Sequence, residues 1–227
     1  MTAEPVVVGP RSRSERTAGS RLLILDAAVA CLVEEGYAGA STLAVQARAG
    51  VSRGRLLHHF PSRAELLVAA AEHVATTQLD AVRLRAAALM DDEPTGRERV
   101  DRAIDLMWAT FQEPPFWAAM ELWTAARTDP ALRGALRGEE RRLRAAIAAV
   151  ADGIWGAEIA GSPLYTDLTE LLFTSMRGVA LVYAFEDRPA ATDPHLAVWK
   201  RLAARMLALD SQGSPRGREL FGQPDAR

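Results

Sequence analysis

Three proline-led helix starts constrain the fold of this chain more than any other feature. Asp129-Pro130, Ser162-Pro163 and Asp193-Pro194 each place a side-chain hydrogen-bond acceptor directly before a proline. This pair is typical of the start of an α-helix, because proline lacks the N–H that the first helical position leaves unpaired. No stretch of the chain shows the alternation of a half-buried β-strand. We therefore predict an all-α protein of about nine helices.

The other helices are predicted from apolar spacing and from their end signals. Gly36 and Gly50 are placed to end two helices in a left-handed conformation, and Ser62 with Glu65 forms a capping box for a longer one. The expected helices run over about residues 20–36, 42–50, 52–59, 62–90, 97–112, 116–127, 130–151, 163–186 and 194–209. We expect the polar ends, residues 1–17 with their basic arm and residues 211–227, to be disordered.

Charge and cysteine content narrow the classes of protein only slightly. The first 75 residues hold eight arginines and seven carboxylates, a net +1, while the rest hold 19 basic and 22 acidic residues, a net −3. This asymmetry suits a small basic face on an acidic molecule. The single cysteine, Cys31, excludes an intrachain disulfide, fits a reducing cytoplasm and is read as a core residue. The longest nearly apolar run, 171–185, is too short to cross a bilayer, so we expect a cytoplasmic protein without a membrane segment.

Residues 41–60 have the spacing of a helix-turn-helix. Two short helices are joined by Ala49-Gly50-Val51, and glycine allows the positive φ that a tight turn needs. Val45, Ala49, Val51 and Leu56 are predicted to pack the pair, with Phe60 tying it to the first helix. The outward residues of the third helix are then Ser52, Arg53, Arg55, Leu57 and His59. Such a helix fits the major groove, where arginine can bind guanine through two hydrogen bonds, but a solvated charged face is the alternative.

The same stretch resembles a known family. Gly36-Tyr37 and the run 49–67 are similar to the N-terminal domain of the TetR/AcrR family of bacterial transcription regulators, over about residues 18–78. The resemblance implies a homodimer, paired through the last two long helices, that binds a palindromic operator in double-stranded DNA. It further implies release by a small-molecule effector bound in a helical domain, here 79–210, and most often repression.

The resemblance also assigns roles to single residues. It places phosphate contacts at Thr42, His59 and Arg63, base contacts at Arg53 and Arg55, and a close backbone approach at Gly54. Three positions depart from the family pattern. Leu57 replaces a DNA-contacting tyrosine and could touch a thymine methyl group, Gln46 replaces a small residue, and Thr42 replaces an apolar one.

No catalytic or cofactor motif is found, so we expect neither an enzyme nor a cofactor. His58-His59 is a poor metal site, because adjacent helical residues point about 100° apart. Large side chains gather instead in the second half, and the group Trp108, Phe111, Trp117, Met120, Glu121, Trp123, Phe173 and Arg177 is the candidate effector site. Glu121 and Arg177 lie among apolar residues; either they pair, Glu121 with Arg177 or Arg127, or one orients a ligand.

A second function from another class stays open at this point. An all-α protein that sequesters a small molecule would show the same apolar periodicities without binding DNA specifically. A steep fall of affinity for duplex DNA with salt discriminates the two functions, because it reports phosphate contacts.

Overall fold

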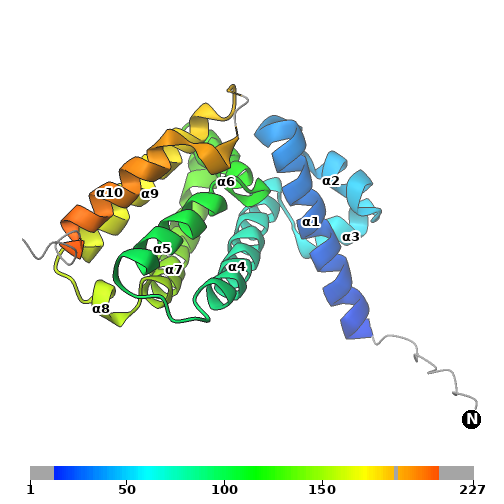
Figure 1. Ribbon diagram of the computed structural model, residues 1–227. Helices are drawn as coiled ribbons and strands as arrows, with labels where there is room; N and C mark the ends of the chain where they lie inside the picture. The colour runs from blue at the N-terminus through cyan, green and yellow to red at the C-terminus, as the bar shows by residue number, and fades with distance from the viewer. Residues whose placement is uncertain (1–12, 187–188, 210–227) are drawn as a thin grey trace, which may run out of the picture. The chain divides into compact units, whose positions relative to one another are not determined.

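The structure is a computed structural model that describes residues 13–186 and 189–209, without the side chains of 13–17 and 138–144. Within these residues it is all-α, as predicted, with ten α-helices and one short 3-10 helix (Figure 1). The elements are α1 (Arg13–Gly39), α2 (Thr42–Ala49), α3 (Arg53–His59), α4 (Arg63–Leu89), α5 (Gly96–Thr110), α6 (Pro114–Ala126), α7 (Pro130–Trp155), α8 (Ala157–Ala160), α9 (Tyr165–Val182), η1 (Ala190–Thr192) and α10 (Pro194–Met206).

Two of the three proline-led helix starts recur as capping hydrogen bonds. The third, Ser162-Pro163, does not, because α9 begins only at Tyr165, with Leu164 as its N-cap and no side-chain cap. Asp129 Oδ1 accepts the Leu132 N–H at 3.0 Å, and Asp193 Oδ1 accepts the His195 N–H at 2.8 Å. The Ser62 hydroxyl accepts the Glu65 N–H at 3.1 Å. The sequence did not predict α8 and η1, which contain four and three residues. Elements this short carry too little apolar periodicity to be recognised.

The two ends of the chain depart from expectation or lie outside the described residues. Helix α1 begins at Arg13, so it extends into the segment 1–17 that we expected to be a disordered arm. Residues 1–12 and the expected tail 211–227 lie outside the described residues. Inside α1, Gly36 has the non-helical angles φ 70° and ψ −178°, so α1 consists of two helices that meet at a kink, and the first of them ends at the predicted stop.

The chain divides into two compact units, and unit 1 takes in a stretch, 114–146, that the sequence assigned to the helical domain 79–210. Unit 1 comprises Met1–Leu79 and Pro114–Ala146, and unit 2 comprises Asp80–Glu113 and Ile147–Arg227. Helix α6 and the first part of α7 therefore belong with the helix-turn-helix. The expected boundary lies near the middle of α4, which contributes to both units.

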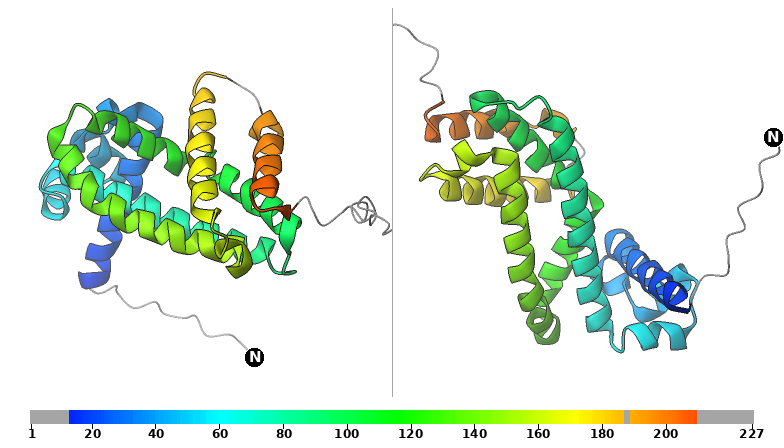
Figure 2. Two further views of the ribbon diagram at one scale, coloured as in Figure 1. Left: turned by 90° about the vertical axis from the view of Figure 1, so that its left-hand side faces the viewer. Right: turned by 90° about the horizontal axis from the view of Figure 1, so that it is seen from below.

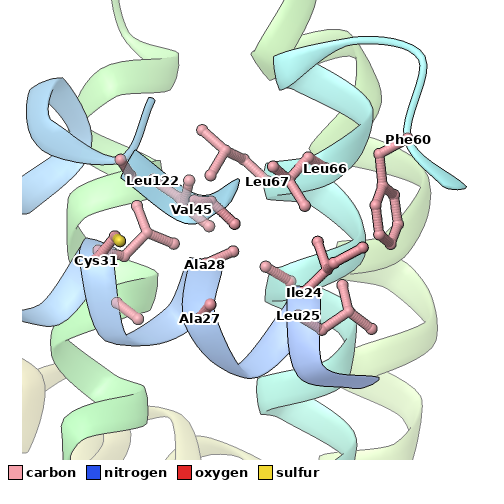
Figure 3. Close-up of a cluster of buried hydrophobic side chains, with 14 of the residues drawn as sticks. Ile24, Leu25, Ala27, Ala28, Cys31, Val45, Phe60, Leu66, Leu67 and Leu122 are labelled. Carbon is pink, nitrogen blue, oxygen red and sulfur yellow. The ribbon is translucent and has the colours of Figure 1, made fainter. Parts of the chain in front are cut away.

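Unit 1 has a core drawn from α1, α2, α4 and α6, with Leu56 and Phe60 from α3 and its end and Leu132 from the start of α7. The side chains in Figure 3 converge between these helices, and Cys31 is fully buried among them, as predicted for a core residue. Val45, Leu56 and Phe60 are buried, while Ala49 and Val51 pack partly buried against the same core. The predicted packing of the two short helices is therefore confirmed.

Unit 2 is built around an aromatic cluster on α5, α9 and α10. The Trp108 ring centroid lies 5.1 Å from that of Trp199 and 5.8 Å from that of Tyr183. The indole N–H of Trp108 donates to the Ala190 carbonyl at 2.8 Å, so burying this ring leaves no unpaired donor. Figure 2 shows α9 and α10 side by side.

Candidate nucleic-acid interface

Helix α3 is held by a turn and two caps that the sequence encodes locally. The Ser41 hydroxyl accepts the Ala44 N–H at 3.1 Å, which caps α2, and the Ser52 hydroxyl accepts the Arg55 N–H at 3.3 Å, which caps α3. Between them, Gly50 has φ 63° and ψ 30°, the left-handed conformation predicted for the turn. These hydrogen bonds satisfy the first N–H groups of both helices and set the angle between them.

The outward face of α3 carries most of the residues that the sequence singled out. Ser52, Arg53, Gly54 and Arg55 are exposed, and Leu57 keeps 40% of its surface exposed. His59 and Thr42 are half-buried. A Cβ added to Gly54 would meet nothing within 4 Å, so this part of the backbone faces open space. Only the inward side, represented by Leu56, contributes to the core.

The arginines of α3 lack the carboxylate partners that several arginines elsewhere in the structure have. Several others lie beside carboxylates: Arg48 by Glu34, Arg83 by Asp80, Arg97 by Asp101, and Arg102 by Asp92 and Glu98. Among the residues whose side chains are described, no carboxylate pairs with Arg53 or Arg55. Two uncompensated guanidinium groups on one exposed helix face give it a positive potential that attracts an anionic partner.

His59 lies at the end of this face in positive surroundings. Burial lowers the pKa of His59 below its ordinary value of 6.5, and the positive charges of His58, Arg21 and Arg55 lower it further. Arg21, on α1, was not singled out from the sequence. Its guanidinium carbon lies 5.5 Å from the Phe60 ring centroid, a long-range contact that leaves no local pattern in the sequence.

Arg63, a predicted phosphate contact, is engaged inside unit 1. Its Nε donates to the Ala40 carbonyl at 3.0 Å, one terminal nitrogen donates to the Tyr37 carbonyl, and its guanidinium carbon lies 4.1 Å from the Tyr37 ring centroid. Arg63 therefore fixes the turn between α1 and α2, directly before the Ser41 cap. No local pattern predicts this role, because the two acceptors are backbone carbonyls.

Glu121 has a partner that neither sequence alternative foresaw. Its carboxylate Oε2 accepts the Tyr37 N–H at 2.7 Å, a donor that the kink at Gly36 releases from regular helical pairing. The Tyr37 hydroxyl in turn donates to Asp129 Oδ2 at 3.0 Å. The expected ion pairing of Glu121 with Arg127 or Arg177 is thus replaced by a backbone hydrogen bond. Tyr37 joins α1 to α4, α6 and the start of α7.

The eight candidate effector residues are not gathered into one unit. Trp117, Met120, Glu121 and Trp123 lie on α6 in unit 1, whereas Trp108, Phe111, Phe173 and Arg177 lie in unit 2. In unit 2, the Phe111 and Phe173 ring centroids are 5.3 Å apart, and the Arg177 guanidinium carbon lies 5.6 Å from the Phe173 centroid. Trp108 and Phe111 are buried in the core, which is the structural role that the sequence left open for them.

Metal and membrane sites were also considered. Among the described residues, no group of three or more His, Cys, Asp or Glu side chains is arranged to hold a metal ion. Likewise, no described helix combines the length and apolar character that crossing a bilayer requires.

Comparisons with known proteins identify the family. The family model described as "Bacterial regulatory proteins, tetR family" matches residues 24–70, which include α2 and α3. The HTH-type transcriptional regulator CymR of Pseudomonas putida is 32% identical over 175 residues, covering 75% of this chain and 82% of that protein. The chain belongs to the TetR family. It is a helix-turn-helix transcriptional regulator, and its named relatives are regulators rather than enzymes.

Solved structures agree with this TetR-family fold. Salmonella enterica GusR has a TM-score of 0.57 at 21% identity, with 84% of this chain and 96% of that chain covered. A member of the TetR family from Streptomyces coelicolor has a TM-score of 0.55 at 23% identity, covering 82% and 97%. The similarity extends well beyond the residues matched by the family model, so the helices of both units follow the family fold.

Proposed function

We propose that this TetR-family regulator is a homodimeric repressor whose α3 helices enter successive major grooves of a palindromic operator. The observation that carries the proposal is the exposed, unpaired state of Arg53 and Arg55 on a helix anchored by Leu56 and Phe60. A guanidinium that gives up no internal ion pair can bind a guanine edge at low cost. Because a bacterial operator lies in the cytoplasm, the proposal places the protein there.

Residues around Arg53 and Arg55 supply contacts to the DNA backbone in this proposal. Thr42 and His59 offer side-chain donors, while Ser52 and the open backbone at Gly54 lie at the start of α3, where the helix dipole attracts phosphate. Arg63 is half-buried, and in this proposal the part of its guanidinium that its contacts with Ala40 and Tyr37 leave open reaches a phosphate. Phosphate contacts set the register of the protein, and base contacts set sequence.

An exposed apolar face on α9 and α10 supports the dimer. Leu168 and Leu172 point into unit 2 and are buried, whereas Leu171 and Leu181 remain 47% and 43% exposed on the other side of α9. Gly178, seven residues after Leu171 and so near the same face, has nothing within 4 Å of an added Cβ. An apolar face with a small residue lets a second helix approach closely, and two-fold pairing would cover it.

A small apolar or amphipathic effector completes the proposal. Phe173 and Arg177 are half-buried on α9, where an apolar ring and a charged group could orient such a molecule. Release requires that the effector favours a protein conformation with lower operator affinity, and it lowers that affinity by no more than this preference.

Selection of bound duplexes from a random pool tests the DNA-binding proposal. We expect a palindromic site and a steep fall of affinity with salt. Arg53→Ala should lose about 1–3 kcal/mol of discrimination at one base pair of each half-site. Arg83→Ala, which removes an exposed arginine already paired with Asp80 at 3.0 Å, is the matched control and should keep full base preference. Binding that depends little on salt and selects no site would favour the sequestering alternative.

Light scattering tests the dimer. The wild type is expected to be a dimer and Leu171→Glu a monomer, because a carboxylate would be buried without a partner in the paired faces. Leu84→Glu changes another exposed leucine, 75% exposed on α4, and should remain dimeric. A dimeric Leu171→Glu variant would contradict the assignment of this face.

A further inference from the structure

Positive and titratable side chains from α1 and α3 gather around Phe60. The Arg21 guanidinium carbon lies 5.5 Å from the ring centroid of Phe60, which is itself buried. The His59 ring centroid lies 6.2 Å from that of Phe60 and 5.5 Å from that of His58. Phe60 thus holds the exposed Arg21 of α1 beside the end of the DNA-facing helix.

This cluster, made of Arg21, Arg55, His58 and His59, has no internal counter-charge. The charged groups that act on His59 are Arg21 from α1 and Arg55 and His58 from α3, and all three repel its protonated form. Within the described side chains, no carboxylate is paired with Arg21 or Arg55. Like charges that lie together without a counter-charge repel one another and attract an anion, so the cluster is a candidate anion-binding site.

We propose that Arg21, Arg55 and His59 together hold one phosphate of the operator backbone, so that α1 binds DNA from outside the helix-turn-helix. The inference deepens the proposed function and rests on it. The occupant is a duplex phosphate rather than a free anion, because Arg55 and His59 lie on the helix that meets the duplex. Arg21 contributes to affinity and not to base choice, since a phosphate carries no sequence information.

Proton uptake follows from the same geometry. A phosphate beside His59 replaces repulsion by attraction, so the protonated imidazole is favoured in the complex and disfavoured in the free protein. Binding then takes up a proton between the two pKa values of His59. Affinity should rise as the pH falls from 8 to 6, by up to about tenfold per pH unit for each of the two protons that a dimer can take up, one at each His59.

Arg21→Gln is the central variant, measured against the selected operator and against a random duplex at several salt concentrations. We expect about a 3- to 10-fold loss on both duplexes alike, and a salt slope smaller by about 1.8, the value for two phosphate contacts, one from each subunit of the dimer. Arg21→Lys keeps the charge and should restore much of the affinity. Arg83→Gln removes a paired exposed arginine and should change neither quantity.

His59→Gln supplies the second readout, the pH dependence of affinity. This variant should lose most of the rise between pH 8 and pH 6, whereas Arg21→Gln should retain part of it. Inorganic phosphate at constant ionic strength should not compete with operator DNA; effective competition would show a free-anion site instead. A wild type that binds no DNA refutes the proposed function. A wild type that binds while Arg21→Gln keeps its affinity and salt slope refutes this inference alone.

Discussion

Gly36 and Gly50 both have positive φ, yet replacing each by alanine should have very different consequences. At Gly50, with φ 63° and ψ 30°, an added Cβ meets nothing within 4 Å. Gly50→Ala therefore costs the left-handed strain, about 1 kcal/mol. At Gly36, φ 70° and ψ −178° define a region that side chains hardly enter, and the Cβ would lie 3.1 Å from Oε2 of Glu121.

The cost at Gly36 has two parts. Backbone strain in this region amounts to about 1–3 kcal/mol. Displacing Glu121 weakens the hydrogen bond that its carboxylate accepts from the Tyr37 N–H at 2.7 Å, which contributes about 1.5–3 kcal/mol for a charged acceptor. Because the hydrogen bond is weakened and not lost, Gly36→Ala should destabilise unit 1 by about 2–5 kcal/mol, a large share of the 5–15 kcal/mol typical of a folded domain.

Urea unfolding followed by circular dichroism measures both variants, and a double-mutant cycle with Glu121→Ala isolates the second part. Without the Glu121 carboxylate, Gly36→Ala loses the contact and keeps only the strain. The cycle should give a coupling of about 1–2 kcal/mol between the two positions, well above the 0.5 kcal/mol expected of independent sites. Equal costs for Gly36→Ala and Gly50→Ala, or an additive cycle, would refute this account.

Three further outcomes are expected. Burial alone would raise the pKa of Asp193, but the hydrogen bonds from Tyr183 at 2.6 Å and from His195 outweigh it and leave the pKa below the ordinary 3.8. This stabilisation is present above pH 3.8 and is lost as the pH falls through the lowered pKa. Tyr183→Phe should accordingly cost about 1.5–3 kcal/mol at pH 7 and progressively less in acid unfolding. Burial raises the pKa of the Cys31 thiol, so maleimide labelling of the native protein at pH 8 should be at least about a hundredfold slower than in urea; similar rates would show that the thiol is accessible. Ser41→Ala removes the cap of α2 and should lower the free energy of unfolding by about 1 kcal/mol; an unchanged urea midpoint would contradict the capping role.

Local signals predicted the fold well. The caps at Asp129 and Asp193 and the glycine turn at Gly50 depend on neighbours within a few residues, and each was recognised from the sequence. The assignment of α6 to unit 1 was not recognised from the sequence, because it depends on where α6 packs. Leu122 of α6 joins the core of α1 and α4, although it lies 83 positions after the end of α1 and 33 after the end of α4.

In the candidate site, too, features that depend on local sequence were predicted, and features that depend on tertiary contacts were not. Exposure of Arg53 and Arg55 follows from the helical phase relative to Leu56, which the sequence shows directly. The role of Arg63 toward backbone carbonyls and the approach of Arg21 to Phe60 are tertiary contacts. Polar groups with distant partners leave no periodic trace, so sequence reasoning did not foresee the internal contacts of Arg63 and overlooked Arg21.

The shared core of unit 1 bears on how this regulator could be re-engineered. A truncated chain ending at residue 79 would lose Ala118, Leu122 and Leu132 from beneath α1, together with the carboxylates that hold Tyr37. Grafting the operator specificity of this protein onto another sensor would therefore require transplanting 114–146 along with the N-terminal helices, because two separate segments of the chain form a single folding unit.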